Sequence, residues 1–267
     1  MLSIGKKHIG SPAVMGILNV TPDSFSDGGS YRNVTDAIAH AMRMVDDGAD
    51  IIDIGAESTR PGFSPISEKE EMDRLFPVIR GIREISDITI SVDTRKSKVA
   101  YEAMSAGADI LNDVNSFRDT GMFECASEFG APIILMHCPK DVENVHQKDM
   151  IGDPIPQIIS FFEERMQVAE SYGIDRKDIV LDPGIGFGKS MEQNASILDR
   201  LESLRIGNPL LVAVSRKRVL SHIYPDMDRD ESTILANLDS ISKGADIVRV
   251  HDTRRMVEAI RGCTHRL

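Results

Sequence analysis

Eight short apolar runs, each rich in β-branched residues, recur along this 267-residue chain. Between them lie segments whose apolar residues have helical spacing, for example residues 35–48 and 70–86. Alternation of strand and helix predicts parallel strands, because each helix carries the chain back to the starting edge of the sheet. The runs cover residues 13–20, 50–57, 88–94, 109–114, 131–137, 178–184, 209–215 and 246–252.

The tetrapeptide Gly-Ala-Asp-Ile occurs three times, starting at Gly48, Gly107 and Gly244. Each copy follows a helical segment and precedes an apolar run, so its glycine is predicted to end a helix. The runs are apolar almost throughout, which indicates strands buried on both faces. We therefore predict a (β/α)8 TIM barrel that forms a single domain over residues 1–267, in preference to an open doubly wound sheet.

The composition is that of an ordinary globular protein, with 41% hydrophobic and 27% charged residues and a net charge of −11. Such an acidic chain repels nucleic acid and anionic membranes, so neither is expected as a partner. A negatively charged substrate would have to be held by a few cationic side chains placed locally.

Cys125, Cys138 and Cys263 are odd in number and include no C-x-x-C pair, which disfavours a zinc site and a redox couple. No run approaches the length of about 20 apolar residues that crosses a membrane. The N-terminal segment becomes polar at Asn19, too early for the core of a signal peptide. We therefore expect a reduced, cytoplasmic protein.

Polar side chains stand at the end of almost every apolar run. In a parallel barrel all eight carboxyl ends open onto one face. A single strand-end Asp or Asn commonly caps the next helix, but so many together favour one shared pocket. These side chains are Asn19, Asp53, Glu57, Asp93, Asn112, His137, Asp182, Ser215, Arg249 and His251.

Residues 181–190, Leu-Asp-Pro-Gly-Ile-Gly-Phe-Gly-Lys-Ser, look at first sight like a phosphate-binding loop. The Walker pattern needs a glycine where this chain has Pro183, which has no N–H to donate to a phosphate. The dinucleotide pattern fails too, because its third glycine falls one residue early, at Gly188. Asp182 therefore needs another explanation.

Eight motifs, in order along nearly the whole chain, resemble those of the dihydropteroate synthase family. The resemblance implies a (β/α)8 barrel, usually a homodimer, that acts as a transferase in folate biosynthesis. Such an enzyme condenses 6-hydroxymethyl-7,8-dihydropterin diphosphate with 4-aminobenzoate, releases pyrophosphate with Mg²⁺, and is expected to be inhibited by sulfonamides. The motifs lie at residues 16–29, 50–62, 91–96, 110–114, 135–137, 181–189, 215–217 and 249–252.

The resemblance also implies a pterin site. Asp182 would hold the pterin, whose adjacent N–H and NH2 donors suit the two oxygens of a carboxylate. Asp93 and Asn112 would make further pterin contacts. Lys217 would donate to a ring oxygen or nitrogen, unless it is only part of a solvated run of charges. Phe187 would flank the aminobenzoate ring, although an isolated Phe more often serves packing.

The diphosphate needs cations and donors. Arg249 and His251 alternate along the eighth run, so their side chains share one face and can converge on a phosphate. His251 could instead be a core histidine satisfied within the fold. Thr59 and Arg60, in the loop with glycine and proline after the second run, could close from the opposite side. Asn19 matches the position that helps to hold Mg²⁺ with diphosphate oxygens and water.

An aromatic amine is a poor nucleophile, so departure of pyrophosphate is expected to come first. Mg²⁺ and the cationic side chains would offset its charge, while Asp93 would stabilise the pterin cation electrostatically. Loops 20–31 and 58–65 are rich in Gly, Ser and Pro and are expected to close over the reacting centre. The expected catalytic residues are Asp93, Lys217, Arg249, His251 and Arg60.

Three regions depart from the family pattern: residues 138–150, with Cys138 where a pterin-contacting methionine is common, Arg218, and residues 226–237. Two alternatives stay open. One is a pterin-dependent methyltransferase that passes a methyl group to a corrinoid protein, and the other is a relative that binds pterin without catalysis. A methyltransferase has no use for a diphosphate site, so Arg249 with His251 argues against it.

Overall fold

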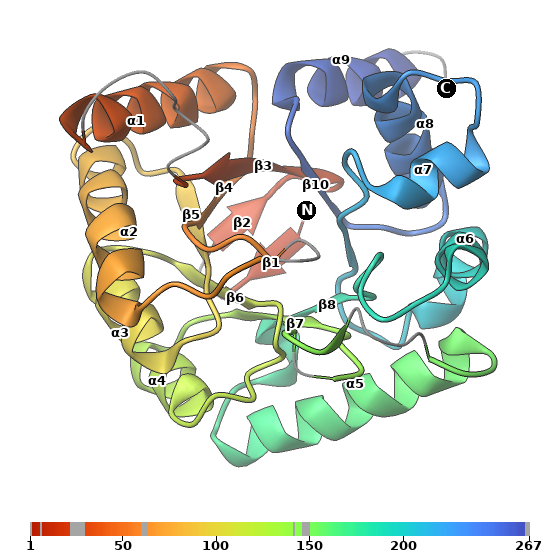
Figure 1. Cartoon of the computed structure of the whole chain (residues 1–267), viewed down its shortest axis with the longest axis horizontal. Helices are drawn as coiled ribbons and strands as arrows, with labels where there is room; N and C mark the ends of the chain where they lie inside the picture. The colour runs from red at the N-terminus through yellow and green to blue at the C-terminus, as the bar shows by residue number, and fades with distance from the viewer. Residues whose placement is uncertain are drawn as a thin grey trace.

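Eight parallel strands with helices outside them form the body of the computed structural model (Figure 1). The strands pair side by side, and a parallel bridge between Leu181 and Leu210 joins the two ends of the sheet. The N–H of Leu181 also bonds to the carbonyl of Pro209 at 2.9 Å, so the sheet is closed. The predicted (β/α)8 barrel is therefore confirmed. The structure describes residues 2–5, 7–21, 30–59, 63–140, 142–145 and 150–264.

The sheet has the order β8-β7-β6-β5-β4-β3-β10-β9. Its strands are β3 (Ala13–Asn19), β4 (Ile51–Gly55), β5 (Thr89–Asp93), β6 (Ile110–Asp113), β7 (Ile133–Met136), β8 (Ile179–Asp182), β9 (Leu211–Val212) and β10 (Ile247–Val250). The helices are α1 (Ser30–Asp46), α2 (Glu68–Arg83), α3 (Ser97–Ser105), α4 (Met122–Phe129), α5 (Pro154–Ser171), α6 (Met191–Asp199), α7 (Arg218–Ile223), α8 (Arg229–Ser242) and α9 (Thr253–Thr264), with 3-10 turns η3 (Arg176–Asp178) and η4 (Leu201–Leu204).

Each barrel strand lies inside one of the eight predicted apolar runs. The shortest is β9, in which only Leu211 and Val212 pair with β10, while the rest of the run 209–215 leads into a turn at Arg216. Helices α1 and α2 also confirm two predicted helices, with shifted ends. Helix α2 begins early because the Ser67 hydroxyl caps it.

Each Gly-Ala-Asp-Ile copy ends a helix, as predicted. The glycine has φ of 97°, 112° or 97°, and its N–H and that of the following alanine bond back to carbonyls of the last helical turn. The aspartate carboxylate then accepts a backbone N–H from a neighbouring strand or its approach, at 2.8 to 3.0 Å. The repeat therefore ends a helix and fixes the start of the next strand. The three aspartates are Asp50, Asp109 and Asp246.

Apolar side chains from the first residues of the strands fill the amino-terminal part of the barrel interior. An antiparallel hairpin of β1 (Leu2–Ile4) and β2 (Lys7–Ile9) lies across the centre of the helix ring (Figure 1), and its buried Ile4 joins this cluster. The polar side chains of the interior lie at the carboxyl end of the barrel. The barrel residues of the cluster are Ala13, Met15, Ile51, Ile110, Ile134, Val180, Leu211, Ala213 and Ile247.

The three cysteines are free thiols, with Cys125 and Cys138 buried and Cys263 exposed. Within the described ranges, no helix combines the length and the apolar character needed to cross a membrane.

Candidate active site

Four polar side chains meet inside the carboxyl end of the barrel. Arg249 of β10 donates from Nε to Asp53 Oδ2 at 2.6 Å and from Nη2 to Asp93 Oδ2 at 3.0 Å. Asn112 donates from Nδ2 to Asp53 at 3.3 Å. Asp53 is fully buried, so Arg249 balances its charge inside the barrel. The sequence pattern marks Asp53 as a strand-end carboxylate but does not identify its partner.

Burial governs the charges of this group. It raises the pKa of Asp93, and the neighbouring Asp53 carboxylate raises that pKa further, while Arg249 acts in the opposite direction. Burial also disfavours the charge of Arg249, but Asp53 and Asp93 outweigh burial and raise the pKa of the guanidinium. Arg249 is therefore a charged donor held between two carboxylates.

Three of the predicted site residues lie at one level of the barrel. The strand register pairs Asn19 with Gly55 of β4, and Gly55 with Asp93 of β5. Asp93 then pairs with Asn112 of β6. The sheet itself therefore brings together side chains that are far apart in the sequence.

Asp182 and Lys217 form the other side of the site. Asp182 is buried at the end of β8, and its Oδ1 accepts the N–H of Gly184 at 2.7 Å. Burial raises the pKa of Asp182, while Lys217 and, less strongly, Arg249 lower it. Burial lowers the pKa of Lys217 to about 8, opposed by Asp182. The Lys217 Nζ donates to the carbonyl of Ile185 at 2.6 Å.

The loop after β8 is held against the end of β7 by its glycines and one buried lysine. Its three glycines have φ of 64°, 87° and 62°, which glycine adopts without steric cost. Lys189 donates from Nζ to the carbonyls of His137, Gly184 and Phe187 at 3.3, 2.8 and 3.0 Å. The Gly-Lys pair that looks like part of a phosphate-binding loop is therefore structural.

Gly184→Ala should destabilise the protein by about 1–3 kcal/mol more than Gly130→Ala. A Cβ on Gly184 would lie 2.1 Å from the His137 carbonyl oxygen, a backbone atom that cannot rotate away. Gly130 has a similar φ, 57° against 64°, and nothing lies within 4 Å of its Cβ position, so its substitution adds backbone strain alone. Chemical denaturation of both variants measures the difference. Equal losses of unfolding free energy would contradict the packing argument.

Lys217 follows a residue with an unusual backbone conformation. Arg216 has φ of 59°, in the left-handed region that is uncommon for residues other than glycine. Helix α8 holds this turn: Thr233 Oγ1 accepts the Arg216 N–H at 3.1 Å, and Asp230 accepts from the guanidinium at 2.7 and 3.2 Å. The turn directs Lys217 toward the barrel. The sequence motif alone does not reveal it.

Arg249 and His251 have different partners. Arg249 bonds to carboxylates, whereas Nδ1 of His251 lies 2.9 Å from the hydroxyl of Ser215. His251 also borders a cavity of about 250 Å³ that Arg43 and Arg216 line as well. Asp47 and Asp252 line the same cavity, so side chains of both charges lie beside His251.

An apolar cluster lies beside these groups. Phe187 is buried in it, and Lys217 Nζ lies 5.1 Å from the centre of the Phe187 ring. Cys138 is fully buried in the same cluster, where burial raises the pKa of its thiol. The thiol therefore stays protonated and serves as a small apolar side chain. The cluster consists of Val114, Met136, Cys138, Val142, Val145 and Phe187, with Phe63 packed against it.

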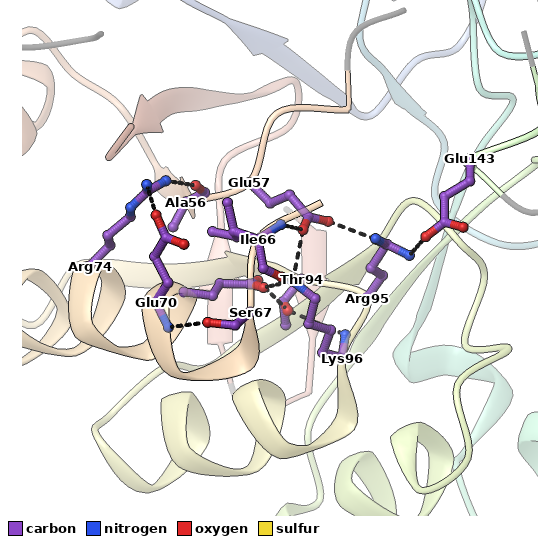
Figure 2. A network of polar contacts seen from close by, with 11 residues as sticks. Ala56, Glu57, Ile66, Ser67, Glu70, Arg74, Thr94, Arg95, Lys96 and Glu143 are labelled. Atoms are coloured by element: carbon purple, nitrogen blue, oxygen red, sulfur yellow. Dashed lines mark hydrogen bonds and ion pairs between the residues drawn. The ribbon is translucent and has the colours of Figure 1, made fainter. Parts of the chain in front are cut away.

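Two further strand-end residues are tied into the framework. The N–H of His137 bonds to the Asp182 carbonyl at 2.7 Å, and burial lowers the pKa of its imidazole to about 2, so the ring is neutral. Glu57, which follows β4, belongs to a network of ion pairs with Arg95 and Lys96, which follow β5 (Figure 2). The Glu57 carboxylate has structural partners, and the His137 ring packs edge-on against Phe161, with 4.9 Å between the ring centres.

Parts of the two predicted loops lie outside the described residues. These parts are residues 22–29 and residues 60–62, so no contact of Arg60 is described. Thr59 follows β4, and Arg218 begins α7 with an exposed side chain. Thr59 lies near the barrel mouth because it follows the carboxyl end of β4 closely in the chain.

The described residues also limit what could hold a metal ion. Among them, no group of three or more His, Cys, Asp and Glu side chains is placed to bind one. The amide of Asn19 stands at the end of β3, level with Asp93. One neutral oxygen ligand suits a Mg²⁺ ion that takes most of its ligands from substrate phosphates and water.

Comparison with known proteins gives consistent results. The model of the pterin binding enzyme family matches residues 15–251. A dihydropteroate synthase of Streptococcus pyogenes serotype M3 is 46% identical over 260 residues, 95% of each chain. The structure of Xanthomonas albilineans dihydropteroate synthase with 4-aminobenzoic acid has a TM-score of 0.89 and 38% identity, covering 96% of this chain and 93% of that one. The same enzyme in complex with 7,8-dihydropteroate has a TM-score of 0.85 and 36% identity, with the same coverage.

The family match spans the barrel from β3 to the residue after β10, and so includes every site group described above. The sequence identity extends over nearly the whole of both proteins. The chain therefore belongs to the pterin binding enzyme family and, within it, to the dihydropteroate synthases.

Proposed function

We propose that this protein transfers the pterinylmethyl group of 6-hydroxymethyl-7,8-dihydropterin diphosphate to 4-aminobenzoate and releases pyrophosphate. The observation that carries the proposal is the convergence of Asp182, Lys217 and the pair of Arg249 with Asp93 at the carboxyl end of one barrel. Solved relatives hold 4-aminobenzoic acid and 7,8-dihydropteroate, which are a substrate and the product of this reaction.

The pterin ring lies against Asp182 in this proposal. A carboxylate offers two acceptors to the adjacent N–H and NH2 donors of the pyrimidine edge. Asp182 already uses Oδ1 to accept from Gly184, which fixes the orientation of the carboxylate. Asn112 and Lys217 then contact the ring from β6 and from the turn after β9, and Asp93 lies level with Asn112.

The diphosphate lies between Arg249 and His251 on one side and Thr59 with Arg60 on the other. A guanidinium has five N–H donors, and the two carboxylate bonds of Arg249 leave others for a phosphate. Asn19 would hold Mg²⁺ together with diphosphate oxygens. When bound, this ion would stabilise the charge on the leaving oxygens.

The reaction begins with cleavage of the bond between the exocyclic methylene and the diphosphate oxygen, whose electron pair leaves with pyrophosphate. Arg249 stabilises that charge electrostatically, and Asp93 faces the positive charge left on the pterin. The amine nitrogen of 4-aminobenzoate, placed beside Phe187, then forms the C–N bond and loses one proton, which the released pyrophosphate or solvent takes up. Since the amine is a weak nucleophile, positioning and exclusion of water contribute most of the remaining rate.

Three further properties are proposed from the family resemblance. The protein forms a homodimer, which light scattering during size-exclusion chromatography would test. It resides in the cytoplasm, which suits three free thiols. Sulfonamides compete with 4-aminobenzoate, which inhibition kinetics would measure.

Formation of 7,8-dihydropteroate together with pyrophosphate should require 4-aminobenzoate, pterin diphosphate and Mg²⁺ together. A coupled assay with each component left out in turn tests this requirement. Binding of pterin diphosphate without turnover would instead indicate a binding protein. Methyl transfer to a corrinoid protein, with no release of pyrophosphate, would indicate the pterin-dependent methyltransferase.

The pH dependence of kcat/KM should show the ionisation of Lys217. Its ammonium form, which offers three donors, predominates below the lowered pKa of about 8, so kcat/KM for pterin diphosphate should fall as pH rises through that value. A guanidinium stays charged in this range, so Lys217→Arg should lose this ionisation whatever its absolute rate. A fall at the same pH in Lys217→Arg would assign the ionisation to another group.

A further inference from the structure

A network of ion pairs lies at the base of the loop that carries Thr59 and Arg60. Its centre is Glu57, whose side chain is 5% exposed. Glu57 Oε1 accepts the N–H of Ile66 at 2.9 Å and the ammonium of Lys96 at 2.7 Å, while Oε2 accepts from Arg95 Nε at 2.7 Å (Figure 2). Burial opposes ionisation of Glu57, but the two cations outweigh it and lower its pKa. We call Glu57, Arg95 and Lys96 the Glu57 network.

Lys96 connects the two ends of this loop. Besides Glu57, its Nζ donates to the carbonyl of Ile66 at 2.8 Å and to Glu71 Oε2 at 2.5 Å. Glu71 is itself buried and accepts from Thr94 Oγ1 at 2.6 Å. Residues 57 and 66 are therefore held at fixed positions by the same ammonium, whose side chain is 15% exposed.

Arg95 extends the network to other loops. Its Nη1 donates to Glu143 Oε1, in the segment after β7, at 3.0 Å. Its guanidinium carbon lies 5.8 Å from the centre of the Phe63 ring, and Phe63 packs on the apolar cluster that contains Phe187. The segments after β4, β5 and β7 are therefore joined around one guanidinium.

A contribution to the stability of the fold is a poor explanation for the ion pairs of the Glu57 network. Buried ion pairs often contribute little net stability, because removing the charges from water costs about as much as their attraction returns. What charged hydrogen bonds do provide is direction, since each donor and acceptor must meet in a set geometry. Fixing both ends of a short loop also removes conformations that would otherwise have to be lost when a ligand binds.

We propose that the Glu57 network is a positioning device that fixes residues 57 and 66 on either side of the loop after β4, so that Thr59 is presented to the diphosphate. This inference rests on the proposed function, because it assigns the loop to the diphosphate. In this proposal Glu57, Arg95 and Lys96 are positioning residues that act through the loop and not by contact with a substrate. Their effect should therefore be selective for the ligand that carries phosphate.

Glu57→Gln tests the inference, since it removes the charge and keeps the shape. We expect its affinity for the pterin diphosphate, measured by calorimetry with Mg²⁺, to fall about tenfold, while its affinity for the hydroxymethylpterin without phosphate stays unchanged. Arg95→Gln should lower the ratio of the affinity for the pterin diphosphate to the affinity for the hydroxymethylpterin in the same way. This variant keeps the bond between Lys96 and Glu57, so it provides the test if Glu57→Gln folds poorly. The double variant should lose less than the sum of the two single losses, because both substitutions break one network.

Asp73→Asn is the matched control. It also turns a carboxylate into an amide next to a lysine, but Asp73 and Lys69 form an exposed pair on α2, 2.6 Å apart. It should leave both affinities unchanged. The positioning role would be overturned if both variants, Glu57→Gln and Arg95→Gln, lost affinity equally for the two pterins. It would also be overturned if neither variant lost affinity for the pterin diphosphate.

The two proposals fail in distinguishable ways. If the wild-type protein binds both pterins but releases no pyrophosphate, the proposed reaction is wrong, while the affinity ratio still tests the network. If the wild-type protein is active and Glu57→Gln leaves the affinity ratio unchanged, the network inference alone is wrong.

Discussion

Replacing Arg249 with alanine should lower kcat/KM for the pterin diphosphate by about 100- to 1,000-fold, the usual effect of removing a donor that stabilises transition-state charge. Its affinity for pterin diphosphate should fall far more than its affinity for the bare hydroxymethylpterin, since only the diphosphate carries the charge that Arg249 matches. The variant should also lose about 3–5 kcal/mol of unfolding free energy, because the fully buried carboxylate of Asp53 and the partly buried one of Asp93 would be left without their cation.

A second substitution separates the two effects. Adding Asp53→Asn to Arg249→Ala removes one of the unpaired charges, so much of the unfolding free energy should return. Activity should not return, because the cation that faces the diphosphate is still absent. Recovery of activity together with stability would show that Arg249 acts only through the fold, and the methyltransferase and binding-only alternatives would then gain support.

Replacing Asp182 with asparagine should weaken pterin binding by about 1.5–3 kcal/mol, the loss expected for a hydrogen bond to a charged group. The amide presents one acceptor and one donor where the pterin edge presents two donors, so one of the two bonds becomes a clash of donors. Calorimetry with the hydroxymethylpterin measures this loss.

The fold should tolerate this substitution. Burial raises the pKa of Asp182, so its ionised form is disfavoured in the folded protein and a neutral amide relieves that cost. The amide oxygen can still accept the N–H of Gly184. A variant with unchanged melting temperature and unchanged pterin affinity would remove Asp182 from the pterin site.

Most of the barrel could be predicted from the sequence because its signals are local. Each strand is a short apolar run, and each Gly-Ala-Asp-Ile copy combines a left-handed glycine with an aspartate that binds a neighbouring strand. Asn19, Asp93 and Asn112 each stand at the end of a predicted strand, and the register of the strands puts them at one level of the barrel. Periodicity and the parallel topology are sufficient for this part of the site.

The partners of the charged residues were harder to predict, because they depend on residues far away in the chain. Nothing near Arg249 in the sequence indicates Asp53 as its partner, and the two meet only because β10 and β4 both flank β3. Lys189 follows glycines that suggest a phosphate, yet it binds three carbonyls. Arg216 adopts a left-handed conformation that its residue type does not favour.

The most direct test is the product itself. The purified protein, given 6-hydroxymethyl-7,8-dihydropterin diphosphate, 4-aminobenzoate and Mg²⁺, should form 7,8-dihydropteroate and pyrophosphate in equal amounts. Mass spectrometry measures the first product, and a phosphate assay after treatment with pyrophosphatase measures the second in the same sample. Asp182→Asn and Arg249→Ala should form far less of both. Pyrophosphate without dihydropteroate, or neither compound while both substrates bind, would contradict the assignment of this chain as a dihydropteroate synthase.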